Sequence, residues 1–252
     1  MLHHKSFGQG QPLVILHGLF GMLDNWQTLA RTWAEEYHVI LLDLRNHGRS
    51  FHADAMDYSL MATDVAETLE ELTIDECYLL GHSMGGKVAM QVALDYPELV
   101  RKLIVVDIAP RRYRPGHNDV FAALEALDPP TIADRKAAAA AMSLHVSDPG
   151  VQLFLLKNLT RNPGGGFRWR MNLPVIKENY DRLIGPVGQL GDSFDEPTLF
   201  LRGGKSGYVQ DEDQELIQML FPLAELQTVA DAGHWVHAEQ PAAMLDAVGA
   251  FL

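Results

Sequence analysis

The sequence predicts an α/β fold with a mainly parallel central sheet. Short apolar runs alternate along the chain with amphipathic helical patterns, the order expected when helices connect parallel strands. The chain has 252 residues, 47% of them hydrophobic and 21% charged, so it can bury a sizeable core. This composition excludes intrinsic disorder, collagen and coiled coils.

Four strands are predicted in the first part of the chain, at residues 13–16, 39–42, 77–80 and 103–106. A helix is expected from Asn25 to about Glu36, with Asp24 as its N-cap. The next helix has one apolar face made of Met61, Val65, Leu69 and Leu72. A third helix follows the glycine-rich stretch at 81–86 and runs to about Asp95, since Pro97 ends it.

The sequence pattern changes between residues 109 and 196, where strand-like apolar runs are absent and several helices are expected. Val120, Leu124 and Leu127 mark one helix; Thr131 and Asp134 resemble a capping box, and Asp148-Pro149 opens another helix. A turn or hairpin loop is expected at 162–166. Strands at 198–201 and 226–229 and helices at 211–220 and from 241 complete the pattern. We therefore expect an α/β core at 1–108 and 197–252, interrupted by a helical cap at 109–196.

The strongest chemical signal is Gly81-His82-Ser83-Met84-Gly85, which lies between a predicted strand and a predicted helix. A serine on such a sharp turn projects its hydroxyl above the sheet edge, and the glycines allow the close packing of the turn. The alternative is a strand–helix turn without chemistry. In this context we predict that Ser83 is a nucleophile.

A nucleophilic serine needs a base and donors for the developing oxyanion. The loop His17-Gly18-Leu19-Phe20-Gly21 follows the first predicted strand, so the backbone N–H groups of Leu19 and Met84 are the expected oxyanion hole. His234, in a late loop, is the expected base. Its competitor His237 is expected to pack or cap instead, and His47 and His52 are assigned to a turn. No histidine cluster has zinc-ligand spacing, so no metal is expected.

These motifs, in this order, resemble the α/β-hydrolase superfamily. More narrowly, residues 43–50 (DLRNHGRS), 81–87 (GHSMGGK), 106–110 (VDIAP) and 233–237 (GHWVH) resemble the YbfF-like group of bacterial esterases and its eukaryotic relatives. The resemblance covers nearly the whole chain. It implies an α/β-hydrolase fold with an inserted helical cap, a Ser–His–Asp triad and no cofactor.

The acid of the triad does not stand at the usual position in this sequence. In most of the superfamily it follows a late strand, but Ser206 stands there, and a hydroxyl cannot carry the charge that stabilises an imidazolium. Asp107 ends the strand after the nucleophile helix, at a position that the resemblance also implies, and is our choice. Asp211 and Asp213 are the alternatives, although both open a helix. Arg45 and Arg49 are expected to brace the turn at Asp43.

The sequence therefore predicts a serine hydrolase of esters or thioesters in which Ser83 attacks, His234 transfers the proton and Asp107 orients His234. A C–C hydrolase, a lyase, an acyltransferase and a non-catalytic receptor remain alternatives. Basic side chains outnumber acidic ones between residues 109 and 191, which predicts either charge pairing with the core or attraction of anionic substrates such as coenzyme A thioesters. The residues expected to contact substrate are Phe20, Arg111, Arg112, Arg114 and Trp235.

The composition also bears on partners and location. A net charge of −13 argues against nucleic acid and anionic lipid surfaces as partners. No apolar run is long enough to insert into a membrane, and the N-terminus has no secretory signal pattern. Cys77 is the only cysteine, so no intrachain disulfide can form, and we expect a cytoplasmic protein. The sequence does not indicate the oligomeric state.

Overall fold

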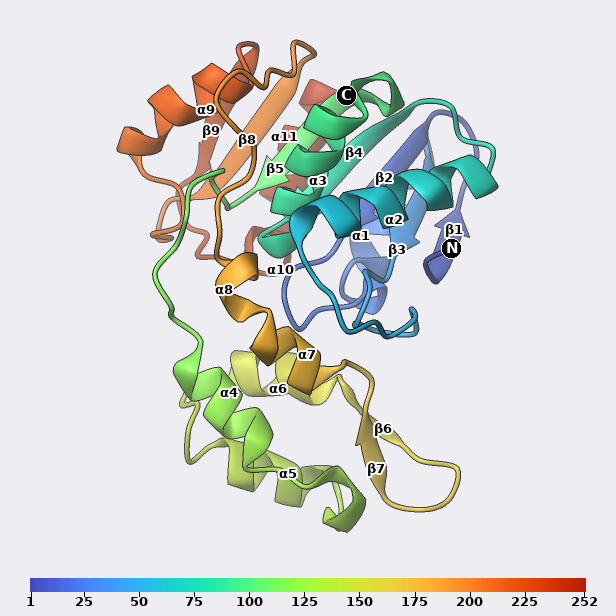
Figure 1. Ribbon diagram of the computed structural model, residues 1–252, viewed down its shortest axis with the longest axis vertical. Coiled ribbons are helices and arrows are strands. Elements are labelled where there is room, and N and C mark those ends of the chain that lie inside the picture. Colours follow the sequence, from blue (N-terminus) through green and yellow to red (C-terminus); the bar gives the residue numbers. More distant parts are fainter.

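A computed structural model describes residues 1–252 and contains a seven-stranded sheet of order β1-β3-β2-β4-β5-β8-β9 (Figure 1). Only β1 is antiparallel to its neighbour. The strands are β1 (His4–Phe7), β2 (Pro12–Leu16), β3 (His38–Leu42), β4 (Cys77–His82), β5 (Val100–Val106), β8 (Thr198–Gly203) and β9 (Ala224–Val229). The predicted strands are therefore present. Only an exposed strand end at His3 and His4 was predicted for β1, without bounds, because its residues, HKSF, form no apolar run.

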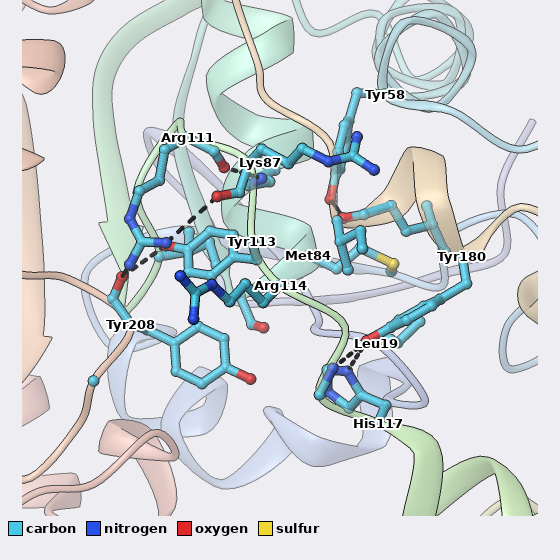
Figure 2. A pocket seen from close by; sticks show the side chains of 17 residues that line it. Leu19, Tyr58, Met84, Lys87, Arg111, Tyr113, Arg114, His117, Tyr180 and Tyr208 are labelled. Atoms are coloured by element: carbon cyan, nitrogen blue, oxygen red, sulfur yellow. Dashed lines mark hydrogen bonds between the residues drawn. The ribbon is translucent and has the colours of Figure 1, made fainter.

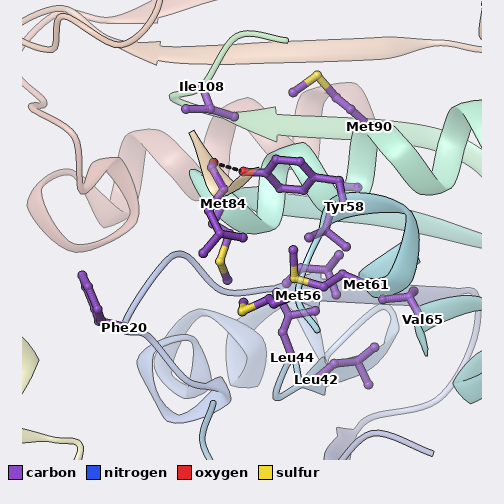
Figure 3. Packing of buried hydrophobic residues seen from close by; sticks show 14 of the residues in the cluster. Phe20, Leu42, Leu44, Met56, Tyr58, Met61, Val65, Met84, Met90 and Ile108 are labelled. Atoms are coloured by element: carbon purple, nitrogen blue, oxygen red, sulfur yellow. Dashed lines mark hydrogen bonds between the residues drawn. The ribbon is translucent and has the colours of Figure 1, made fainter. Parts of the chain in front are cut away.

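Helices cover both faces of this sheet. They are α1 (Gln27–Trp33), α2 (Tyr58–Glu71), α3 (Met84–Asp95), α9 (Gln214–Leu220), α10 (Val236–Glu239) and α11 (Pro241–Phe251). Side chains alternate along each buried strand, so Val14 and Leu16 of β2 join one core, whereas Leu13 and Ile15 join the other. Figure 3 shows part of the first core, in which methionines of the loop before α2, of α2 and of α3 pack together.

The chain between β5 and β8 forms a separate group of elements below the sheet in Figure 1. We call it the α4–α8 segment: α4 (Asn118–Glu125), α5 (Arg135–Met142), α6 (Pro149–Leu156), β6 (Leu159–Arg161), β7 (Phe167–Trp169), α7 (Leu173–Glu178) and α8 (Tyr180–Leu183). Its apolar side chains are continuous with the core on the α2 and α3 face of the sheet. The loop expected at 162–166 is present, and of the two alternatives it is the hairpin loop, since it joins the short antiparallel strands β6 and β7.

Several local predictions were wrong for identifiable reasons. Asp24 does not cap α1, because it lies inside a short 3₁₀ turn (Leu23–Asn25) and forms an ion pair with Lys5 at 2.8 Å. Thr131 belongs to another 3₁₀ turn, and Asp134 is itself the N-cap of α5, accepting a hydrogen bond from the Ala137 N–H. Both errors concern helix starts, where a tertiary partner or a one-turn shift outweighs local preference.

Of the two arginines expected to brace the turn at Asp43, only Arg49 contacts Asp43. The Arg49 backbone N–H donates to Asp43 Oδ2 at 2.9 Å, and the Leu23 N–H donates to Oδ1 at 2.8 Å. Arg45 points elsewhere: its guanidinium forms a buried bidentate ion pair with Asp64 of α2. This pair connects the loop after β3 to α2. None of the helices is both long enough and apolar enough to cross a lipid bilayer.

Candidate active site

Ser83 occupies a strained turn between β4 and α3. Its φ is 54° and its ψ −120°, a region that costs a non-glycine residue about 1–3 kcal/mol. The flanking glycines make the turn possible by close approach. A Cβ on Gly81 would lie 2.1 Å from the Gly85 carbonyl oxygen, and one on Gly85 would lie 2.5 Å from the Leu16 and His17 carbonyl oxygens.

The Ser83 hydroxyl is within hydrogen-bonding distance of an imidazole that in turn contacts a buried carboxylate. Ser83 Oγ lies 3.0 Å from His234 Nε2, and His234 Nδ1 lies 2.7 Å from Asp107 Oδ2. The Asp107 side chain is fully buried. With Nδ1 donating to the carboxylate, Nε2 is left as an acceptor for the serine proton. The structure thus brings together the three residues that the sequence analysis selected from three separate segments.

Asp107 is held by more than the histidine. It follows β5 with a φ of 51°, and its Oδ1 accepts a hydrogen bond from the Gly203 N–H at 2.9 Å. Its Oδ2 also accepts a hydrogen bond from the hydroxyl of Ser206. The alternatives are engaged elsewhere: Asp213 forms an ion pair with Arg111 at 2.7 Å, and Asp211 forms one with Arg202.

His234 is positioned by two further aromatic residues. Its ring stacks on Tyr208 with 3.8 Å between centroids, and its backbone carbonyl accepts a hydrogen bond from His82 Nε2 at 2.8 Å. Burial lowers the pKa of His82 well below its usual value, with the neighbouring His237 and His234 as smaller causes. A neutral His82 can therefore serve as a fixed donor. Sequence reasoning missed both Tyr208 and His82, because neither contact follows from chain spacing.

Two unpaired backbone donors lie near the serine, one in the loop after β2 (Leu19) and one at the start of α3 (Met84). Neither the Leu19 N–H nor the Met84 N–H donates to another protein group. Phe20 has a φ of 60°, and its N–H donates to His47 Nε2 at 3.2 Å, while the Leu44 N–H donates to His17 Nε2 at 3.0 Å. The imidazole of His47 therefore accepts a hydrogen bond from this loop, and the imidazole of His17, within the loop, accepts one from the loop after β3.

These two imidazoles are neutral. Burial lowers the pKa of His17 to about 4. Burial is also the main cause that lowers the pKa of His47 to about 3, and the neighbouring His17 lowers it further. Each donates its Nδ1 hydrogen to a carbonyl, that of Gly18 for His17 and that of Arg45 for His47. His47 thus has a structural role in supporting the oxyanion loop, beyond the turn to which the sequence analysis assigned it.

Two cavities meet at Ser83 and differ in character. The smaller, of about 290 Å³, is lined by apolar side chains that include Phe20, Trp26, Val151, Phe154 and Trp235. His237 lies in its wall, stacked on Trp26 at 4.3 Å, so the expectation that it packs is confirmed. Phe20 and Trp235, two of the residues expected to contact substrate, therefore line this apolar cavity.

The larger cavity, of about 510 Å³, is shown in Figure 2 and is lined by tyrosines and cations, among them Arg111, Arg112 and Arg114. Two of these arginines already have partners: Arg111 pairs with Asp213, and Arg112 pairs with Asp181. Arg114 forms no ion pair and is exposed. It is therefore the arginine of the three whose charge is free for a ligand.

Lys87 lines the same cavity and was not singled out by the sequence analysis. It lies one turn after Ser83 in α3, almost fully buried, and its Nζ donates to the Arg111 carbonyl at 2.7 Å and to the Gly185 carbonyl. Burial, followed by the charges of Arg111 and Arg112, lowers its pKa to about 7. Lys87 thus ties the nucleophile helix to both ends of the α4–α8 segment.

Charge pairs also join the α4–α8 segment to the rest of the chain. Arg170 lies 3.6 Å from Asp24, and Arg182 lies 3.9 Å from Asp57. With Arg111 and Asp213, these pairs connect the basic segment to acidic residues outside it, which favours the simpler of the two explanations for its charge. No group of three or more His, Cys, Asp or Glu side chains is arranged to hold a metal ion.

Comparisons with known proteins agree with this fold. A family model described as the alpha/beta hydrolase fold matches residues 11–241. The chain belongs to the α/β-hydrolase family. Within this family it is 39% identical to "Esterase YbfF" of Escherichia coli over 242 residues, which cover 96% of this chain and 92% of that protein.

Two further α/β-hydrolase relatives extend this result. The chain is 42% identical over 248 residues to the mouse protein named "sn-1-specific diacylglycerol lipase ABHD11", covering 95% of this chain and 80% of that one. A solved structure titled "Marine microorganism esterase" superposes with a TM-score of 0.98 at 39% identity, covering 100% of this chain and 99% of the other. The resemblance noted from the motifs is thereby confirmed.

Proposed function

We propose that this chain is a serine hydrolase that cleaves carboxylic esters through an acyl-enzyme on Ser83. One observation carries the proposal: the continuous contact from Ser83 Oγ through His234 to the buried Asp107, beside two unpaired backbone N–H groups. The esterase and lipase names of relatives near 40% identity support the same reaction.

The geometry defines a role for each group. Ser83 Oγ attacks the acyl carbon and gives its proton to His234 Nε2, and Asp107 stabilises the resulting imidazolium. The carbonyl oxygen becomes an oxyanion, to which the Leu19 and Met84 N–H groups donate. His234 then protonates the departing alcohol. A water molecule, deprotonated by His234, attacks the acyl-enzyme, and the free acid leaves as Ser83 regains its proton.

The two cavities support a division of the substrate. We assign the acyl chain to the apolar cavity beside Phe20, Phe154 and Trp235, since apolar surface there is removed from water. The leaving group then enters the larger cavity, where the Tyr208 hydroxyl and Arg114 suit polar or anionic groups. An acyl thioester with an anionic leaving group, such as an acyl-coenzyme A, fits this division. In this proposal the helical cap expected at 109–196 provides walls of both cavities.

The test uses a fluorophosphonate probe and a panel of esters. We expect the probe to label the wild type at Ser83 and to leave Ser83→Ala unlabelled, while that variant loses ~10⁴–10⁶-fold in kcat with an unchanged melting temperature. Ordinary ester turnover by a folded Ser83→Ala protein would contradict the proposal. Acyl chains of increasing length, offered as simple esters and as coenzyme A thioesters, then define the acyl group and the leaving group.

A further inference from the structure

A third cleft, of about 410 Å³, lies away from the two cavities at Ser83 and shares no lining residue with them. Its walls come from the loop after β3 and from the β6–β7 hairpin. Three arginines line it, Arg49, Arg168 and Arg170, together with His52, and no carboxylate does. The proposed ester hydrolysis uses none of these residues.

The charge in this cleft is not neutralised by its surroundings. Arg170 lies 3.6 Å from Asp24, but that carboxylate also pairs with Lys5 at 2.8 Å. Arg49 and Arg168 have no acidic side chain within 4.0 Å and are exposed. Asp43, the acid closest to Arg49 in sequence, uses its two oxygens to accept backbone N–H groups.

The two walls of the cleft are held in fixed positions by hydrogen bonds between distant segments. His52 Nε2 donates to the Arg170 carbonyl at 3.0 Å, and the Asn172 N–H donates to the Asn46 carbonyl at 2.9 Å. Strands β6 and β7 pair with each other from Leu159 to Trp169. The backbones that carry the three arginines are therefore positioned before any ligand arrives, which reduces the ordering cost of binding.

We propose that this cleft is an anion site that binds a phosphate monoester through Arg49, Arg168 and Arg170. Guanidinium groups in one cleft repel each other, and a dianion with three terminal oxygens can accept hydrogen bonds from all of them. A carboxylate has one charge and two oxygens, so it matches three guanidinium groups less well. Thr160 lines the same cleft, and its side chain carries a further donor.

Calorimetric titration at low ionic strength tests the site with inorganic phosphate and with glycerol 3-phosphate. We expect each of Arg49→Gln and Arg168→Gln to weaken binding about tenfold or more, because each removes one charge-assisted contact. The matched control is Arg161→Gln, in the same hairpin, since Arg161 lies over the Phe167 ring and does not line the cleft. The control should bind as the wild type does, and turnover of a neutral ester confirms that each variant is folded.

Two sources of the phosphate group are distinguished by vesicle sedimentation. Binding of glycerol 3-phosphate in solution assigns the site to a soluble phosphomonoester. Sedimentation with vesicles of phosphatidic acid in phosphatidylcholine, lost in Arg49→Gln and Arg168→Gln, assigns it to a lipid headgroup. Absence of both, or binding that both variants leave unchanged, would overturn the proposal while leaving the proposed ester hydrolysis intact.

Discussion

The Ser206 hydroxyl donates a hydrogen bond to Oδ2 of Asp107, the same carboxylate oxygen that His234 Nδ1 contacts. The two residues follow neighbouring parallel strands, β5 and β8. Ser206 therefore stands at the position where most of the superfamily has its acid, and it supports the acid that comes from the adjacent strand. A hydroxyl there donates a hydrogen bond to the buried carboxylate and limits its rotation.

Removing this hydroxyl tests the support. We expect Ser206→Ala to lower kcat by roughly 10-fold, because the carboxylate keeps its charge and its Gly203 contact but loses one hydrogen bond. KM should change little, since Ser206 lines neither cavity at Ser83. Steady-state kinetics with a neutral ester measures both. Ser143→Ala, which removes an exposed hydroxyl in the α4–α8 segment, is the matched control.

The choice of acid makes a stronger prediction. Asp107→Asn should cost ~10²–10⁴-fold in kcat, because a neutral amide neither stabilises the imidazolium nor maintains the tautomer of His234. Asp211→Asn should be close to wild type, and Asp213→Asn should affect only the contact with Arg111. If Asp107→Asn kept the wild-type kcat while Asp211→Asn or Asp213→Asn lost it, the aspartate whose variant lost activity would be the acid of the triad.

The unpaired arginine of the larger cavity predicts a charge-dependent substrate preference. Arg114→Glu should lower kcat/KM for an acyl-coenzyme A and leave it nearly unchanged for a neutral short ester. The difference should shrink at high salt, because exposed charges are screened beyond ~8–10 Å. Arg112→Glu is the comparison, since Arg112 already pairs with Asp181. If salt and Arg114→Glu changed kcat/KM equally for both substrates, the charge of Arg114 would have no role in attracting the substrate.

Stability should fall as the pH drops from about 6.5 toward 4. Burial lowers the pKa of His17 to about 4 and is the main cause that lowers the pKa values of His47 and His237 to about 3. In that window the unfolded chain binds protons that the folded chain excludes. Each histidine therefore lowers the free energy of unfolding by roughly 1.4 kcal/mol for every unit by which folding lowers its pKa.

Urea unfolding at several pH values measures this slope. His47→Gln should reduce it, because an amide keeps an oxygen acceptor for the Phe20 N–H but does not titrate. His4→Gln is a suitable control, since His4 lies at the start of the edge strand β1. A slope in His47→Gln identical to that of the wild type would exclude His47 as a source of the pH dependence.

Much of the candidate site could be predicted from local sequence because its geometry is a property of turns at strand ends. The glycines around Ser83 are required by contacts within a few residues and with the adjacent β2, and the strand that precedes them is evident as an apolar run. Asp107 could be selected in the same way, as the polar residue that ends a buried strand. Parallel strands then bring such ends to one edge of the sheet.

The sequence by itself determined the α/β order of elements, the helical character of the segment between β5 and β8 and the identity of the three residues in contact at Ser83. Only the tertiary structure decided which partner each polar side chain takes: Ser206 with Asp107, Arg45 with Asp64, Lys87 with the Gly185 carbonyl. The physical reason is range. Periodicity and turn chemistry act over a few residues, whereas these partners are separated by 19 to 99 positions and meet only once the sheet is assembled.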